Sequence, residues 1–178
     1  MRCSVFCAVS LDGFIARKDG ALDWLKPAEA GLPPADTGYD AFMASVDYVV
    51  MGRNTFDVVL KMSDTWFYPK PVVVLTTRPL DLPAHLKGKV EGGRHSPAEL
   101  VSLMEKRGAK RLYVDGGKTI QEFLNAGLID DLVITQIPVL IGGGIPLFGP
   151  LEKDVKLTLE SSRVLGGGAV QTTYRVAR

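Results

Sequence analysis

Val114 to Leu124 reads VDGGKTIQEFL and places an acid and two adjacent glycines between an apolar run and a helical pattern. Each glycine in regular structure costs about 0.5 to 1 kcal/mol relative to alanine, because the chain loses more conformational freedom there. A glycine after a strand is usually a turn residue, but it also lets a ligand contact the backbone. In open α/β sheets, ligands bind where strands end and helices begin, since the free N–H groups of a helix start carry a partial positive charge. The stretch therefore indicates an α/β fold with a ligand site at this turn.

Strand and helix patterns alternate on both sides of this stretch. Apolar runs rich in Val, Ile and Tyr predict strands over 2–10, 47–51, 71–76, 111–114, 132–139, 155–162 and 169–176. Helical patterns cover 36–46, 54–60, 97–108 and 119–126. The helix over 97–108 has a clear start signal, with Ser96 as N-cap, Pro97 as first helical residue and Glu99 as capping-box partner.

The order of these patterns predicts the topology. Strands that alternate with helices up to Leu132 imply parallel strands joined by crossovers, with helices on both faces of the sheet. The last strands have no helix between them, and LGGGAV separates the final two, so we expect an antiparallel C-terminal hairpin. The fold class is therefore α/β, with a mixed, mostly parallel twisted sheet of about seven or eight strands.

The composition is that of one soluble globular domain. The 178-residue chain is 46% apolar and 23% charged, with a formal net charge of +1, which predicts a single domain over residues 1–178. Charges of both signs are scattered along the chain, and this argues against a nucleic-acid partner. No run reaches the roughly 18 apolar residues of a membrane span.

The two cysteines indicate a reducing compartment. Cys3 and Cys7 lie in one strand pattern, about 13 Å apart on the same face, so a disulfide between them is excluded. We interpret both as small apolar residues that face the core. Asp12 interrupts the N-terminal apolar run and no cleavage site follows, which disfavours a signal peptide. We expect a cytoplasmic protein.

Three strand ends carry groups that suit anions. VVMGRNTF passes from a strand into a helix start, VVLTTRP ends in two hydroxyls and an arginine, and VDGGKTI offers backbone at two glycines. Taken singly, each glycine or arginine is more often a turn residue or a solvated charge. Two arginines at separate strand ends suit a dinucleotide that bears a ribose 2'-phosphate. The chain has neither G-x-G-x-x-G nor G-x-x-x-x-G-K-[ST], so neither familiar phosphate loop explains the site.

Five motifs carry a resemblance to a known family: SLDGFIA at 10–16, DYVVMGRNTFD at 47–57, LTTRP at 75–79, VDGGKTIQEFLNAGLIDDLVI at 114–134 and PVLIGGGIPLF at 138–148. In this order and spacing they resemble the dihydrofolate reductase-like superfamily. The closest resemblance is to the reductase domain at the C-terminus of bifunctional riboflavin biosynthesis proteins and to its stand-alone bacterial relatives. The resemblance covers nearly the whole chain.

This resemblance implies that NADPH is the cofactor. It places the pyrophosphate and adenosine phosphate at Gly52, Arg53, Asn54 and Thr55, and the 2'-phosphate at Thr76, Thr77 and Arg78. The pyrophosphate and nicotinamide ribose are expected at Gly116, Gly117, Lys118, Thr119 and Ile120. The nicotinamide is expected at Ala8 and Ile15. Asp115 is grouped with these residues and is interpreted as a turn or cap residue rather than a catalyst. Family members join the two glycines by a cis peptide, so a cis bond is expected between Gly116 and Gly117.

The proton donor is less well defined than the cofactor site. A nicotinamide supplies its own hydride, so the protein has to position it and provide a proton. Folate reductases keep an acid on the first helix, and counting back from MGR places it at Asp36, with Asp40 one turn later. Either aspartate would otherwise be an N-cap or a surface acid. Trp24 is interpreted either as part of a mobile loop over the pocket or as a packed core residue.

Neither a metal site nor deaminase chemistry is expected. His85 and His95 fall in predicted loops without clustered ligands, and the zinc deaminase signature is missing. The expected substrate is a small pyrimidine- or pterin-like heterocycle. An NADPH-binding module without turnover and a different phosphorylated ligand in the same cleft remain alternatives.

The resemblance also implies a homodimer. The C-terminal strands and LIGGGIPLFG are the expected partner surface, although Pro138 and Pro146 are equally well explained as strand ends.

Overall fold

The computed structural model describes residues 1–25, 37–63 and 65–177. Within these residues, eight strands form one sheet in the order β5-β4-β3-β6-β1-β7-β10-β9, and β2 pairs with β8 in a second, small sheet. The strands are β1 (Arg2–Ser10), β2 (Phe14–Ala16), β3 (Tyr48–Gly52), β4 (Val72–Leu75), β5 (Val90–Gly93), β6 (Arg111–Asp115), β7 (Asp131–Ile137), β8 (Ile145–Pro146), β9 (Leu157–Val164) and β10 (Val170–Val176). The helices are α2 (Tyr39–Ser45), α3 (Arg53–Met62), α4 (Pro97–Lys106) and α5 (Gly117–Asn125).

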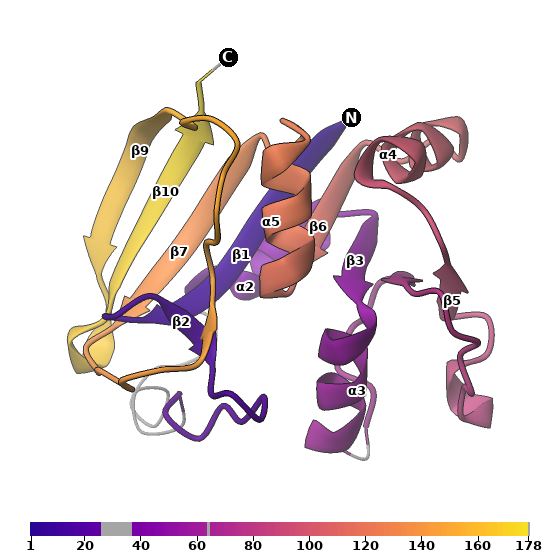
Figure 1. Cartoon of the computed structure of the whole chain (residues 1–178), viewed down its shortest axis with the longest axis horizontal. Helices are drawn as coiled ribbons and strands as arrows, with labels where there is room; N and C mark the ends of the chain where they lie inside the picture. Colours follow the sequence, from indigo (N-terminus) through magenta and orange to yellow (C-terminus); the bar gives the residue numbers. More distant parts are fainter. Residues whose placement is uncertain (26–36, 64, 178) are drawn as a thin grey trace.

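The strand directions confirm the predicted fold class. β1 pairs in parallel with β6 and β7, and β3 pairs in parallel with β6 and β4. β10 runs antiparallel to both β7 and β9. The carboxyl ends of β1, β3, β4 and β6 consequently meet at one edge of the sheet, the lower edge in Figure 1. We call this edge the carboxyl edge.

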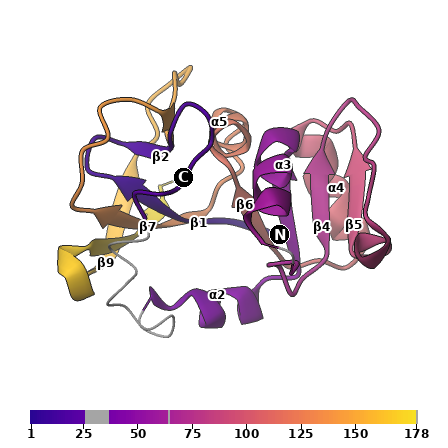
Figure 2. The ribbon, with the colours of Figure 1, turned by 90° about the horizontal axis from the view of Figure 1, so that it is seen from below.

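Helices cover both faces, as predicted, because the central strands are apolar on both faces. Val49, Val50 and Met51 are successive residues of β3, and all are fully buried. One core cluster includes residues of α4 and α5, and the other includes residues of α2 together with Phe56 of α3. Figure 2 shows α2 and α5 on opposite sides of the sheet, and Figure 1 shows α3 continuing beyond the carboxyl edge.

Local signals were confirmed where the sequence was explicit. Ser96 and Glu99 form the predicted capping box at the start of α4. Cys3 is buried, and both cysteines are free thiols. The short Gly166–Gly168 turn joins β9 to β10 in the expected antiparallel hairpin. None of the described helices is long and apolar enough to cross a membrane.

Three strands were not predicted: β2, β5 and β8. β5 has the sequence VEGG, in which only the first residue is buried, so neither alternation nor a branched apolar run marks it. β2 and β8 are three and two residues long, which is too short for a periodic pattern. Each of these strands forms because a neighbour offers backbone hydrogen bonds, and this depends on the tertiary structure.

Candidate functional site

Two turns of the same kind lie side by side at the carboxyl edge. Gly52 joins β3 to α3, and Gly116 joins β6 to α5, while β3 and β6 are neighbours in the sheet. A Cβ added at Gly116 would lie 2.2 Å from Oγ1 of Thr55, and one at Gly52 would lie 3.1 Å from Oγ1 of Thr119. Each glycine therefore faces the first turn of the other helix, and a larger residue at Gly116 has no room.

The starts of α3 and α5 are open to an anion. The N-cap residues are Gly52 and Gly116, which have no side chain to cap the helix, and the first N–H groups of an α-helix have no intrahelical acceptor. Two adjacent helix N-termini add partial positive charges at one place. Backbone groups of this kind bind phosphate without any sequence motif of their own.

The expected cis peptide between Gly116 and Gly117 is wrong for this structure. No cis peptide bond occurs among the described residues, and Gly116 instead has φ +89°. A positive φ is accessible to glycine, and the turn forms with a trans bond. Gly117 also needs to be glycine, because a Cβ there would lie 2.7 Å from the carbonyl oxygen of Pro146 and 3.1 Å from Cδ1 of Ile15.

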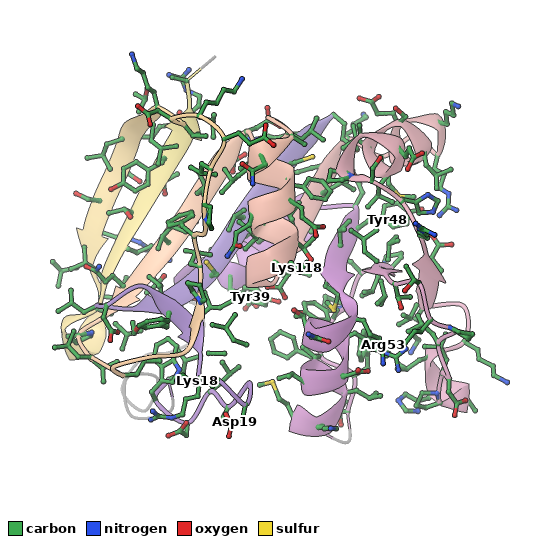
Figure 3. The ribbon with its side chains drawn as sticks, viewed as in Figure 1. Lys18, Asp19, Tyr39, Tyr48, Arg53 and Lys118 are labelled. Atoms are coloured by element: carbon green, nitrogen blue, oxygen red, sulfur yellow. The ribbon has the colours of Figure 1, made fainter. Side chains whose placement is uncertain are left out.

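Arg53 connects the first turn to the segment after β4. Its Nε donates to Asp57 at 2.8 Å within α3, and its Nη1 donates to the carbonyl oxygen of Pro79 at 3.1 Å. In Figure 3, Arg53 lies beside α3 on the side of β4 and β5. The structure thus brings Arg53 to Pro79, the residue that directly follows the predicted 76–78 segment.

The 76–78 segment forms a tight exposed turn. Oγ1 of Thr76 accepts the N–H of Arg78 at 3.0 Å, while the side chains of Thr77 and Arg78 are exposed. No carboxylate of the described residues pairs with Arg78. Its guanidinium is therefore available to a phosphate in solution.

The other predicted cofactor residues differ in their exposure. Ala8 and Ile15 are half-buried, and Ile15 reaches Gly117 as described above. Asn54 and Lys118 are exposed, and the Lys118 side chain is 91% exposed. Ile120 is buried in the core, and its N–H donates to the carbonyl oxygen of Gly116, so its side chain does not face the carboxyl edge.

Asp115 is a half-buried acid with neutral partners. Its Oδ2 accepts the hydroxyl of Tyr68 at 2.6 Å, and its Oδ1 accepts the N–H of Gly116 at 2.8 Å. The second contact is a turn interaction of the kind expected for this residue. Burial raises the pKa of the Asp115 carboxyl, although the Tyr68 and Gly116 hydrogen bonds lower it. No Lys or Arg of the described residues forms an ion pair with Asp115.

Aromatic side chains surround this acid. Tyr68 lies edge-on to Tyr113 and Phe67, and Phe67 also contacts Tyr39 with ring centroids 5.8 Å apart. The Tyr39 hydroxyl is buried and has no hydrogen-bond partner among the described residues. Burial, and to a smaller extent the nearby Asp115 charge, raise the pKa of Tyr39. Sequence reasoning did not identify Tyr39 or Tyr68, and TWFYPK, which contains Tyr68, follows no periodic pattern.

The predicted proton donors are not part of this arrangement. Asp40 is exposed in the first turn of α2, whereas Tyr39 beside it packs against Phe6. Asp36 lies outside the described residues. The roles of Asp36 and Asp40 therefore stay predictions.

Two further residues stabilise the surrounding loops. Asp12 accepts the hydroxyl of Ser10 and the backbone N–H groups of Ile141 and Gly142, so it ties two loops together. Trp24 is 5% exposed and packs with Ile137, Leu165 and Ala169, which favours the core interpretation. In the part of the chain that the structure describes, no three His, Cys, Asp or Glu residues lie together as metal ligands.

The comparisons with known proteins identify the family of the chain and agree with its fold. Residues 3–171 match the family described as the RibD C-terminal domain. The uncharacterized protein YwjB of Bacillus subtilis (strain 168) is 36% identical over 172 residues, which cover 96% of this chain and 95% of YwjB. Dihydrofolate reductase HdrB of Haloferax volcanii is 30% identical over 135 residues, covering 75% of this chain and 64% of HdrB.

Solved structures show the same fold. A Shewanella sp. PV-4 protein, provisionally named for riboflavin biosynthesis, is 43% identical and has a TM-score of 0.92 over the full length of both chains. The Enterococcus faecalis dihydrofolate reductase complexed with NADP(H) is 20% identical, with a TM-score of 0.69 over 99% of this chain and 97% of that one. The second likeness supports the fold alone. The chain therefore belongs to the RibD C-terminal domain family, whose fold is that of dihydrofolate reductase.

Proposed function

We propose that this protein is an NADPH-dependent reductase that transfers a hydride to a pyrimidine- or pterin-like heterocycle. The observation that carries the proposal is the pair of uncapped helix starts at Gly52 and Gly116, with the half-buried acid Asp115 directly beside them. The first feature suits the phosphates of a dinucleotide, and the second suits proton delivery. The family includes reductases, and relatives carry the names of a dihydrofolate reductase and of a 5-amino-6-(5-phosphoribosylamino)uracil reductase.

The residues present fit NADPH. Gly116 and Gly117 are buried, and a Cβ there would lie 2.2 Å from Oγ1 of Thr55 and 2.7 Å from the carbonyl oxygen of Pro146. Glycine therefore lets the two helix starts lie close together, where the N–H groups of both can reach one pyrophosphate. In this proposal Gly52 to Thr55 and Gly116 to Thr119 hold the pyrophosphate, and Thr76 to Arg78 hold the 2'-phosphate. Ala8 and Ile15 line the nicotinamide, which supplies a hydride when bound.

We further propose that Asp115 is the proton source, held in place by Tyr68. A carboxyl with a raised pKa keeps its proton closer to neutral pH and can donate it. The Tyr68 hydroxyl fixes the orientation of the carboxyl, and the surrounding aromatic rings limit access of water. Asp36 and Asp40 remain alternative donors, and the variants at Asp115 described in the Discussion distinguish them.

Titration of the purified protein with NADPH and NADH tests the cofactor. We expect NADPH to bind about tenfold or more tightly than NADH, because a guanidinium adds charge-assisted hydrogen bonds to the 2'-phosphate. Alanine replacement of Arg53 and Arg78 together should remove this preference, whereas Lys118→Ala, at an exposed cation, should keep it. Equal binding of both cofactors by the wild-type protein would refute the proposed 2'-phosphate site.

Turnover separates a reductase from a binding module. Oxidation of bound NADPH is followed by absorbance with dihydrofolate and with 5-amino-6-(5-phosphoribosylamino)uracil as substrates. We expect oxidation with one of them. Tight NADPH binding without oxidation by either compound would favour a nucleotide-binding module, and binding of neither cofactor would favour another phosphorylated ligand.

We also propose a cytoplasmic homodimer. The edge strand β9 is exposed along its whole length, and Leu159 and Val164 are 55% and 76% exposed. Apolar side chains on an open strand edge favour association with a second chain. Analytical ultracentrifugation tests this, and Val164→Lys should shift the equilibrium toward the monomer.

A further inference from the structure

A groove on the α2 face of the sheet lies on the far side of β1 from Asp115. Its volume is about 280 Å³, and it lies between the start of α2 and the strands β1, β7, β10 and β9. A row of paired residues crosses its floor, from Phe6 through Val133 and Thr173 to Ser161. Phe42 of α2 also lines it. The groove therefore has apolar surface at the β1 end and hydroxyls at the β9 end.

Arg163 is the only charged side chain among the described residues that line this groove. Its Nε and Nη2 donate to the same oxygen, Oε1 of Gln171, at 2.9 and 2.6 Å. A guanidinium has five N–H groups, so most of them stay available. No carboxylate of the described residues pairs with Arg163.

Gln171 orients Arg163 without neutralising it. Gln171 is 5% exposed, and its Nε2 donates to the carbonyl oxygen of Thr37 at 3.0 Å and to Oγ1 of Thr135 at 2.9 Å. Both ends of the amide are thus used, and its orientation is fixed. A structural arginine at a sheet edge is commonly paired with an acid, as Arg175 is with Glu160 on the same hairpin. Among the residues that the structure describes, Arg163 thus has a neutral partner and no counter-charge, and it faces the groove.

The register connects this charge to the proposed hydride site. A second row of paired residues runs from Ala8 through Thr135 and Gln171 to Arg163. Adjacent strands are about 4.8 Å apart, so Arg163 lies roughly 14 Å from Ala8 across the same face. A substrate with its reacting atom beside Ala8 and an acidic group at the end of a short chain spans this distance.

We propose that the groove binds the acidic group, phosphate or carboxylate, of the substrate reduced at the carboxyl edge. This inference rests on the proposed reductase function and adds the chemical class of the substrate. Apolar surface at Phe6 and Val133 accommodates the uncharged part of the molecule, and the free N–H groups of Arg163 bind the anion in the geometry that guanidinium prefers. Ser161 contributes a hydroxyl beside it.

Matched ligand pairs test the proposal. The phosphate pair is 5-amino-6-ribitylamino-uracil 5'-phosphate and its unphosphorylated form, and the carboxylate pair is dihydrofolate and its diamide, in which both glutamate carboxylates are converted to amides. Dissociation constants are measured by calorimetry with and without NADP⁺. We expect the wild-type protein to bind the acidic member of at least one pair about tenfold more tightly than the neutral member. The pair that shows the preference identifies the acidic group.

Two arginine variants separate a binding role from a structural one. Arg163→Gln should reduce the preference to about one, while Arg175→Gln, which removes the same charge from the same hairpin, should leave it unchanged. Arg163→Lys keeps the charge but loses the forked geometry and should retain part of the preference, so it serves if Arg163→Gln folds poorly. Affinity for NADPH should be the same in all of these proteins.

Distinct outcomes overturn this inference and the proposed function. The groove is not an anion site if Arg163→Gln still prefers the acidic ligand over the neutral one. The same holds if Arg175→Gln loses this preference to the same extent as Arg163→Gln. Absence of any preference in the wild-type protein also overturns this inference. If the wild-type protein does not bind NADPH or does not turn over, the reductase function is contradicted instead. The ligand titrations without NADP⁺ still test whether the groove binds an anion.

Discussion

Asp115 and Asp131 lie at opposite edges of the same sheet and have opposite surroundings. Asp131 is 1% exposed at the amino end of β7 and accepts hydrogen bonds from Arg2 at 2.6 Å, Arg111 at 3.1 Å and Ser4 at 2.8 Å. Asp115, at the carboxyl end of β6, has only a tyrosine hydroxyl and a backbone N–H as partners among the described residues. One carboxylate is neutralised by two guanidinium groups, and the other is not.

This difference separates a structural acid from one suited to chemistry. Arg2 and Ser4 belong to β1, Arg111 to β6 and Asp131 to β7, so the ion pairs join three adjacent parallel strands. The role that these contacts indicate for Asp131 is to hold the three strands together. An acid that is half-buried with neutral partners has a raised pKa and is a candidate proton donor.

Replacement of the neutralised acid should have the largest effect on stability. In Asp131→Asn, two guanidinium groups lose their buried counter-charge. We expect the free energy of unfolding to fall by about 2 to 4 kcal/mol, below the full cost of breaking a buried pair because Arg2 is half exposed. Urea denaturation measures this, with the exposed Asp154→Asn as control. A loss under about 1 kcal/mol would contradict a structural role for the ion pairs.

Asp115→Asn should reduce activity strongly and stability only slightly. We expect its stability to stay within about 1 kcal/mol of the wild type, since the amide oxygen can accept the N–H of Gly116 while the amide NH2 donates to the Tyr68 hydroxyl oxygen. We expect kcat to fall about 100-fold, because the amide cannot donate the proton, while the Kd for NADPH stays unchanged. Steady-state kinetics on the substrate that the wild-type protein reduces gives the first value, and fluorescence titration gives the second. Full activity in Asp115→Asn would show that Asp115 is not the proton donor and would favour Asp36 or Asp40.

The pH dependence of stability sharpens the comparison without any substrate. The folded-state pKa of Asp115 is raised. The stability that this residue contributes is therefore fully present below its unfolded-state pKa of about 3.9, and it is lost as the pH rises through its folded-state pKa. Unfolding free energy of the wild type should therefore decline relative to Asp115→Asn as pH rises through this window. Chemical denaturation at a series of pH values measures the difference, and a difference that does not change with pH would show that the pKa is not raised.

Deletion of one hydroxyl at each edge should give the smallest effects. Ser4→Ala removes a donor to Asp131 and should cost about 1 kcal/mol of stability without altering the pH profile of kcat.

Tyr68→Phe removes a hydrogen bond that lowers the pKa of Asp115. Its pKa should then rise further, and the loss of kcat at alkaline pH should move to higher pH. The same profile in Tyr68→Phe and the wild type would argue against Asp115 as the donor.

Local sequence patterns were sufficient for most of the fold. The branched apolar runs predicted seven of the eight strands of the main sheet, and Ser96 with Glu99 predicted where α4 begins. Gly52 and Gly116 predicted two turns at strand ends, and the structure adds that each faces the helix start of the other. β5 was missed because its VEGG sequence contains no local strand signal.

The candidate site was predicted only in part. The 52–55 and 116–119 turns lie together as expected, because parallel strands end at one edge whatever the side chains are. Tyr68 was missed because it comes from an irregular segment 47 residues from Asp115. A cis bond was expected between Gly116 and Gly117, but the structure forms this turn with a trans bond and a positive φ at Gly116.

The sequence by itself determined that this chain has a mixed α/β fold with glycine turns at two strand ends, because strand alternation, helix caps and glycine turns are encoded by neighbouring residues. Only the tertiary structure decided that Asp131 is neutralised and Asp115 is not, and that Gln171 holds Arg163 toward a groove. These properties depend on which strands become neighbours and in which register they pair. A pKa or an oriented charge is set by groups that are close in space, and the spacing of residues along the chain does not specify them.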